Sequence, residues 1–157
     1  MSVLDVLARR QEGGPDHAVR VALVVEGGGS RATFSAGMAA AVEDRGLTPL
    51  LDDVYGVSAG SLNAAWLVAG KAREAMSPWT DRSVMRGTID PRRVLRGGRA
   101  VDLSHLAAEG RLLHVRPPDD APAVSRTSTD VGLLADALRI GHEAASSALD
   151  GLPSHAP

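Results

Sequence analysis

Gly56-Val57-Ser58-Ala59-Gly60 is the stretch of sequence from which the fold can be worked out. A short apolar segment ends here and a helical segment begins at once, with small residues on both sides of one serine. A sharp strand-to-helix turn needs such neighbours, because larger side chains would collide with the turn. The turn would expose the Ser58 hydroxyl at the carboxyl end of a sheet, beside helix N-terminal N–H groups that favour an anion. The pattern therefore predicts a serine elbow.

A second glycine-rich turn lies upstream, at Gly27-Gly28-Gly29-Ser30-Arg31. Consecutive glycines allow the backbone to direct several N–H groups toward one point with no side chain in the way. Acyl transfer needs a nucleophile and a pocket of donors for the oxyanion, so the two turns together make chemical sense. The alternative is that both are tight β–α turns with a structural role alone, since such turns are commonly rich in glycine.

The first glycine cluster also fits a dinucleotide-binding fingerprint, as Gly27-x-Gly29-x-x-Ala32. That fold needs an acidic residue at the end of its second strand, whereas Asp52 and Asp53 precede the second apolar segment. A serine elbow has no purpose in a nucleotide fold, and the Gly-Lys-Ser/Thr of a phosphate-binding loop is absent. A nucleotide-binding domain is therefore the weaker alternative.

The order of the apolar segments predicts an α/β fold. Residues 20–25 form a continuous apolar run rich in β-branched residues, which is typical of a parallel strand covered on both faces. Residues 31–45 have the period of a helix, residues 54–57 resemble a second strand, and residues 61–69 a second helix. This order implies a right-handed crossover and a three-layer α/β/α fold with a mainly parallel sheet. The expected buried face of the first helix consists of Phe34, Met38, Ala41 and Val42.

The remaining segments divide the chain around this unit. We expect residues 1–19 to be a peripheral N-terminal arm with one short amphipathic helix, residues 20–150 to be the α/β domain, and residues 151–157 to be a flexible tail. Residues 71–106 are interrupted by proline and glycine and should form short helices and loops. Their arginines could meet an anionic lipid surface, but a solvated face is favoured. These arginines are Arg82, Arg86, Arg92, Arg93, Arg96 and Arg99.

The C-terminal part contains two further predicted elements. Residues 112–115 are predicted to form a strand that two prolines stop. Thr129 or Asp130 can cap a closing helix. The expected buried side of that helix consists of Leu133, Leu134, Ala137, Leu138, Gly141, Ala144, Ala145 and Ala148.

Composition restricts the class of protein. The 157 residues suggest one domain, and with two Trp, one Tyr and one Phe the core must be built from Ala, Val and Leu. The absence of cysteine excludes disulfides, thiolate catalysis and Cys-ligated zinc. A formal net charge of −2 argues against nucleic acid as a partner. The sequence has neither a signal-peptide pattern nor an apolar run of about 18 residues, so we expect a cytoplasmic protein.

The two motifs together resemble the bacterial patatin-like phospholipases. Glu26-Gly27-Gly28-Gly29-Ser30-Arg31, followed by Gly56-Val57-Ser58-Ala59-Gly60-Ser61-Leu62-Asn63-Ala64, agrees with that family in order, spacing and local context. The resemblance implies a lipid acyl hydrolase that acts on a lipid ester without metal or organic cofactor. Peripheral membrane contact is left open. It further implies that Ser58 is the nucleophile, that Gly27, Gly28, Gly29 and Ala59 supply the oxyanion hole, and that Arg31 supports this loop.

The resemblance is broken at the second catalytic residue. The family uses a serine–aspartate dyad, with the aspartate in an Asp-Gly-Gly or Asp-Gly-Ala motif after a strand. The only downstream Asp-Gly here is Asp150-Gly151, close to the C-terminus. We therefore interpret the chain as internally shortened near residues 106–108, with activity impaired by the missing aspartate. The alternative function is a non-catalytic patatin-like relic or binding module.

Histidine is not needed as a base in such a dyad. No motif surrounds any of the histidines, so none is expected to be a catalytic base. The five histidines are His17, His105, His114, His142 and His155.

Overall fold

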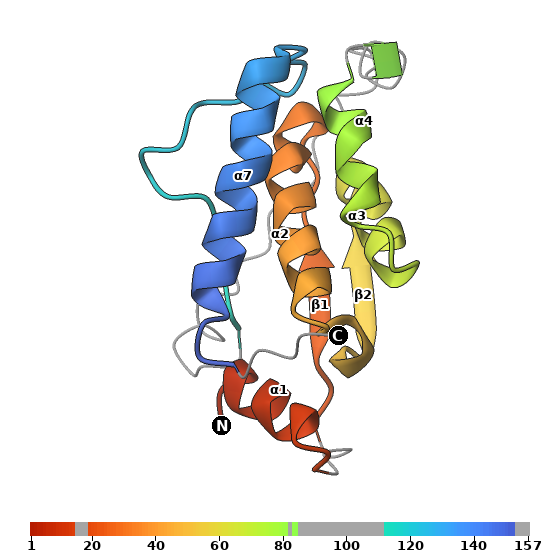
Figure 1. Cartoon of the computed structure of the whole chain (residues 1–157), viewed down its shortest axis with the longest axis vertical. Helices are drawn as coiled ribbons and strands as arrows, with labels where there is room; N and C mark the ends of the chain where they lie inside the picture. The colour runs from red at the N-terminus through yellow and green to blue at the C-terminus, as the bar shows by residue number, and fades with distance from the viewer. Residues whose placement is uncertain (15–18, 82, 85–111, 153–157) are drawn as a thin grey trace.

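The computed structural model describes residues 1–14, 19–81, 83–84 and 112–152. The predicted arginine-rich region beyond residue 84 and the proposed join near 106–108 lie outside these residues. The described elements, in chain order, are α1 (Val3–Gln11), β1 (Ala22–Val25), η1 (Gly29–Arg31), α2 (Ala32–Asp44), η2 (Thr48–Leu50), β2 (Asp53–Gly56), α3 (Ala59–Val68), η3 (Glu74–Met76), α4 (Ser77–Thr80) and α7 (Val131–Ala148) (Figure 1).

The sheet confirms the predicted α/β class. β1 and β2 are parallel and joined by α2, with Ala22 opposite Asp53 and Val25 opposite Gly56. Parallel strands need such a crossover connection. Here the helix predicted from the period of residues 31–45 forms it. α2 and α3 pack against each other, and Leu23 of β1 lies against the core cluster to which they contribute.

The prediction that β1 is covered on both faces is wrong for the part of the chain that the structure describes. Val24 and Tyr55 lie directly opposite each other in the sheet, and they are 66% and 56% exposed. Because successive side chains of a strand point to opposite faces, the helices that cover Leu23 leave this second face open.

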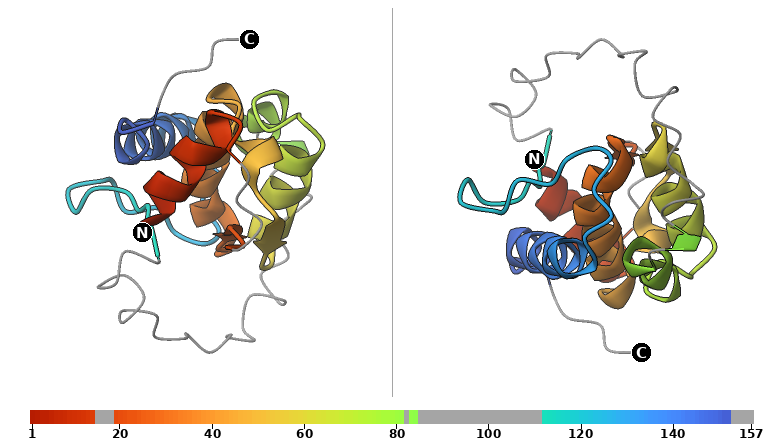
Figure 2. Two further views of the ribbon diagram at one scale, coloured as in Figure 1. Left: turned by 90° about the horizontal axis from the view of Figure 1, so that it is seen from below. Right: turned by 90° about the horizontal axis from the view of Figure 1, so that it is seen from above.

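Helix α2 is buried on more sides than its sequence pattern predicts. Of the four residues expected to face the core, only Ala41 is fully buried, while Phe34, Met38 and Val42 are half-buried. The reason is that α7 lies beside α2, on another side than α3 (Figures 1 and 2). The buried residues of α2 are Ala32, Thr33, Ser35, Ala36, Gly37, Ala39, Ala40 and Ala41.

Two glycines allow α2 and α7 to approach closely. A Cβ at Gly141 would lie 2.8 Å from the carbonyl carbon of Phe34, and one at Gly37 would lie 2.8 Å from the backbone nitrogen of His142. Beyond the far end of α2, Arg45 donates to the carbonyls of Ser146 and Leu149 at 2.8 and 3.0 Å. The two helices therefore run in the same direction, in contact along their length.

Helix α1 belongs to the core, so the N-terminal arm is not peripheral. Ser2 caps α1 through its side chain, and the Asp5 carboxylate accepts from the Ser2 N–H, which completes a capping box. Val6 and Leu7 are 3% and 4% exposed. They share a hydrophobic cluster with Val21, Leu47, Leu149 and Leu152.

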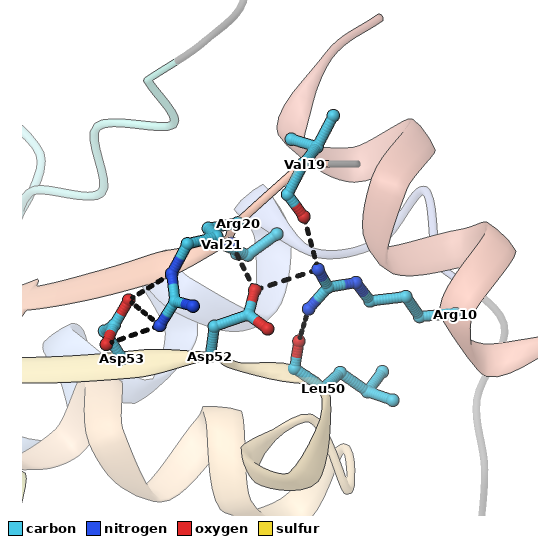
Figure 3. Close-up of polar contacts among 7 residues, drawn as sticks. All are labelled: Arg10, Val19, Arg20, Val21, Leu50, Asp52 and Asp53. Atoms are coloured by element: carbon cyan, nitrogen blue, oxygen red, sulfur yellow. Dashed lines mark hydrogen bonds and ion pairs between the residues drawn. The ribbon is translucent and has the colours of Figure 1, made fainter. Parts of the chain in front are cut away.

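An ion pair fixes α1 to the start of the sheet (Figure 3). Arg10 donates to the carbonyls of Leu50 and Val19 and to the carboxylate of Asp52, at 2.5, 2.6 and 2.8 Å. Asp52 also accepts from the N–H of Val21 at 2.6 Å. The hydrogen bond from the Val21 N–H has the largest effect and the one from Arg10 the next largest, and both lower the pKa of the Asp52 carboxyl.

The C-terminal part differs from the prediction in its strand and agrees in its helix. Residues 112–118 form no strand. Asp130, rather than Thr129, caps α7, because its carboxylate accepts from the N–H of Leu133 at 3.1 Å. The fully buried residues of α7 are Leu134, Ala137, Gly141 and Ala145, all from the predicted side. Among the described helices, none combines the length and apolarity that a bilayer span requires.

Candidate active site

Ser58 occupies a strained turn between β2 and α3. Its φ of +54° and ψ of −126° lie in a region that side chains other than hydrogen disfavour, and it is the only non-glycine residue with positive φ among those described. Its side chain is exposed. Neighbouring glycines make the turn feasible, because a Cβ at Gly60 would lie 2.5 Å from the carbonyl oxygen of Val25, and one at Gly56 2.5 Å from the Cα of Ser61.

The glycine loop lies directly beside this turn. A Cβ at Gly27 would fall 2.9 Å from the Cβ of Ser58 and closer still to the carbonyl oxygen of Val57. Gly28 and Gly29 both have positive φ, at +134° and +62°, so the loop adopts a conformation that glycine alone accepts without strain. The structure thus brings together two turns that are separated by helix α2 in the sequence.

Several backbone N–H groups around Ser58 are unbonded within the described part of the chain. No acceptor is assigned there to the N–H groups of Gly27, Gly28, Gly29 or Ala59. By contrast, the N–H of Ser30 donates to the Arg126 carbonyl at 2.9 Å. The unbonded groups are available to an anion or to solvent.

Arg31 lies next to the glycine loop with its side chain folded back over Gly28. A Cβ at Gly28 would be 3.1 Å from the Nε of Arg31. Arg31 is exposed, and no carboxylate among the described residues pairs with it. The guanidinium therefore adds a positive charge at the edge of the loop.

A buried polar network supports both turns from beneath. Asn63 of α3 is 1% exposed; its Nδ2 donates to the Ala32 carbonyl at 2.8 Å and to Ser35 Oγ at 3.1 Å. Its Oδ1 accepts from Trp79 Nε1 at 3.0 Å. Ser35 Oγ donates to the Ala32 carbonyl at 2.9 Å and lies 3.4 Å from the carbonyl of Glu26, which precedes the glycine loop. Sequence reasoning included Asn63 in the motif but gave it no role, and it did not identify Trp79.

A second support comes from the C-terminal part of the chain. Ser30 is fully buried, and its hydroxyl donates to the Ser128 carbonyl at 2.8 Å, with the Arg126 carbonyl oxygen 3.2 Å from the same Oγ. Gly29 packs on the same carbonyl group, since a Cβ there would be 3.1 Å from the carbonyl carbon of Arg126. No signal in the local sequence indicates this contact, which joins positions about a hundred residues apart.

No base lies beside the serine among the described residues. The Ser58 hydroxyl has no hydrogen-bond partner there. Asp150 instead pairs with Arg45 at 2.5 Å. Because Arg45 follows the C-terminal end of α2, a helix about 20 Å long, Asp150 lies at the opposite end from the glycine loop.

The histidines within the described residues lie elsewhere. His142 of α7 is 2.8 Å from the carboxylate of Asp44, and His114 is exposed. Asp44 also pairs with Arg73. Although partial burial by itself raises the pKa of the Asp44 carboxyl, hydrogen bonds from Arg73 and His142 outweigh it and lower the pKa. The part of the chain described here contains no group of three or more acidic or histidine residues that could hold a metal ion.

The comparisons with known proteins define the class. A family model described as patatin-like phospholipase matches residues 23–117, so the chain belongs to this family. A curated relative, the uncharacterized protein YjjU of Escherichia coli (strain K12), is 37% identical over 91 residues, which are 55% of this chain and 24% of that protein. The chain thus spans about a quarter of that relative's length. No solved structure matches significantly.

Proposed function

We propose that this chain is a serine acyl hydrolase that cleaves a lipid ester, with Ser58 as its nucleophile. The observation that supports this role most directly is the close approach of Gly27 to Ser58. It puts an exposed serine in a strained turn beside a loop of unbonded N–H groups. Membership of the patatin-like family supports a lipid substrate and argues against the nucleotide-binding alternative.

In the proposed reaction, Ser58 Oγ adds to the acyl carbonyl while its proton passes to water, because no base lies beside it among the described residues, and water returns a proton to the leaving alkoxide. The ester C–O bond then breaks, the alcohol leaves, and water cleaves the acyl-enzyme. The N–H groups of Gly27, Gly28, Gly29 and Ala59 stabilise the oxyanion of the tetrahedral intermediate. One such donor typically contributes about two to three orders of magnitude in rate. Arg31 supports the loop.

Apolar side chains next to the serine fit a substrate in a lipid aggregate. Val57 and Leu62 are 63% and 43% exposed and lie one residue before and four residues after Ser58. A contiguous exposed apolar patch marks a surface that binds lipid or protein, and Val57 and Leu62 would contribute to such a patch. We therefore propose peripheral contact with a lipid surface on this side.

A non-catalytic binding module is the second candidate. It is favoured by one specific observation, that no hydrogen bond joins Ser58 Oγ to a carboxylate or imidazole among the described residues. A serine without a base stays protonated and is a weak nucleophile. Such a module would keep the α/β scaffold and the N–H groups without turnover.

Labelling with a fluorophosphonate probe distinguishes the two candidates. The hydrolase predicts labelling of the wild-type protein that is lost in Ser58→Ala. Ser61→Ala is the matched control, because Ser61 is an exposed serine of the same helix and its change should leave labelling intact. A wild-type protein that is correctly folded, is not labelled, and does not hydrolyse a p-nitrophenyl ester would contradict the hydrolase and support the binding module.

A further inference from the structure

We propose that the segment Arg126–Ser128 is a positioning element for the glycine loop, and that it acts through Ser30. This inference deepens the proposed function, on which its catalytic consequence rests. The segment lies outside residues 23–117, the region that matches the family model. The support for the donor loop therefore comes from a part of the chain that the family match does not cover.

Both hydrogen-bond donors of Ser30, its N–H and its hydroxyl, are directed to this segment. The Ser30 N–H donates to the Arg126 carbonyl at 2.9 Å, and its hydroxyl donates to the Ser128 carbonyl at 2.8 Å, with the Arg126 carbonyl oxygen 3.2 Å from the same Oγ. Ser30 is 0% exposed, so water cannot replace these bonds without local opening. They fix the peptide plane between Gly29 and Ser30.

This constraint selects which N–H groups of the loop remain available. The Ser30 N–H is consumed by Arg126, whereas those of Gly28 and Gly29 have no acceptor among the described residues. Both glycines have positive φ, where many backbone conformations are accessible to them. Without a fixed neighbour, the loop would exchange among several orientations of its donors.

The segment is connected to a packed helix. Asp130 caps α7 immediately after it, and α7 contacts α2 through Gly141 and Gly37. Helix α2 in turn begins directly after the glycine loop, at Ala32. The segment Arg126–Ser128 thus lies at the end of the interface between α2 and α7, which gives it a defined position.

The test compares Ser30→Ala with Arg45→Met. Arg45 links the end of α2 to the carbonyls of Ser146 and Leu149, so its change weakens contact with the same C-terminal helix far from the loop. Ser30→Cys is a second variant, which keeps the side-chain size but supplies only a weak donor. Measurements are the fluorophosphonate labelling rate, kcat and KM for a p-nitrophenyl ester, and the NMR shifts of Gly28 and Gly29 with amide exchange at residue 30.

For both Ser30 variants we expect shifted Gly28 and Gly29 signals and faster exchange at residue 30. Labelling and kcat should fall about 10-fold or more while KM changes little, since misplaced donors affect the transition state. Arg45→Met should lower thermal stability yet leave these values within about twofold of wild type. Unchanged signals and exchange in folded Ser30 variants would overturn the positioning role. If the wild type is not labelled, the proposed function fails, while signals and exchange still decide the positioning role.

Discussion

At the scale of single residues, the site depends on positions where no side chain fits. Gly27 is such a position, because an added Cβ would lie 2.9 Å from the Cβ of Ser58 and closer to the Val57 carbonyl. Backbone atoms cannot yield as the end of a flexible side chain can. The glycine requirement at the site is therefore steric, not only conformational.

We predict that Gly27→Ala separates the glycine loop from Ser58. Overpacking should lower the free energy of unfolding by about 1–3 kcal/mol, and displacement of the loop should abolish fluorophosphonate labelling. Urea denaturation and the labelling rate measure the two effects. Gly70→Ala is the control, because Gly70 has a φ of +66° but open space around it, beyond the other end of α3. It should lose about 1 kcal/mol through strain alone and keep its labelling.

Local requirements of this kind are what the sequence could predict at the site. The serine elbow and the glycine loop can each be recognised from five consecutive residues, because tight turns restrict residue type directly. Asn63 could not be given its role, since its partner Trp79 lies 16 residues further on and the network exists only after packing. Ser30 required knowledge of a contact 96 and 98 residues away.

At the scale of elements, the contact between α2 and α7 is the largest interface that the sequence did not predict. The sequence predicted both helices and most of their residues. It could not predict that the Gly37 and Gly141 backbones would touch, because a glycine within a helix can equally mark a nearby helix end or be merely tolerated there. The strand predicted at residues 112–115 failed for a related reason: strands need a partner, and apolar residues alone do not supply one.

We predict opposite outcomes for two glycine substitutions in α7. Gly141→Ala should lower the free energy of unfolding by about 2–3 kcal/mol, because its Cβ would collide with the backbone of Phe34. Gly132→Ala, near the exposed start of the same helix, should raise it by about 0.5–1 kcal/mol through helix propensity. Thermal and urea denaturation measure both. Equal effects of the two substitutions would contradict a close helix contact at Gly141.

The stability that the Arg10–Asp52 ion pair gives to the packing of α1 should depend on pH. The pKa of Asp52 is lowered by the Val21 N–H and by Arg10, so ionised Asp52 stabilises the folded state. This contribution is complete above the unfolded-state pKa of about 4 and is lost as the pH falls further, through the folded-state pKa. The stability of wild type should thus decline more steeply between about pH 5 and 2 than that of Asp52→Asn. Asp119→Asn, in an exposed loop, controls for the loss of one charge.

At the scale of the whole molecule, the two ends of the described chain share one hydrophobic cluster. Leu7 of α1 and Leu149 after α7 are each 4% exposed and belong to that cluster. Trp79, which lies in a different cluster, reports on the other part of the molecule. If the described residues fold as one unit, a substitution that destabilises the first cluster must also lower the stability measured at the second.

We predict that Leu7→Ala lowers the free energy of unfolding by about 2–4 kcal/mol, as expected for a large-to-small change in a core. Urea transitions followed by tryptophan fluorescence and by circular dichroism should shift together. Leu62→Ala is the control, because Leu62 is 43% exposed and should cost less than about 1 kcal/mol. Separate transitions would instead mean that α1 unfolds independently.

The backbone conformation of Ser58 sets thermal stability against labelling of the serine. At φ +54° and ψ −126° a glycine would be unstrained, whereas a serine at this position strains the backbone and lowers the stability of the fold. Ser58→Gly should therefore yield a protein that melts at a higher temperature, with a gain of about 1 kcal/mol, and that has no labelling. Under the proposed function, this strained backbone is what holds the Ser58 hydroxyl in the turn beside the glycine loop.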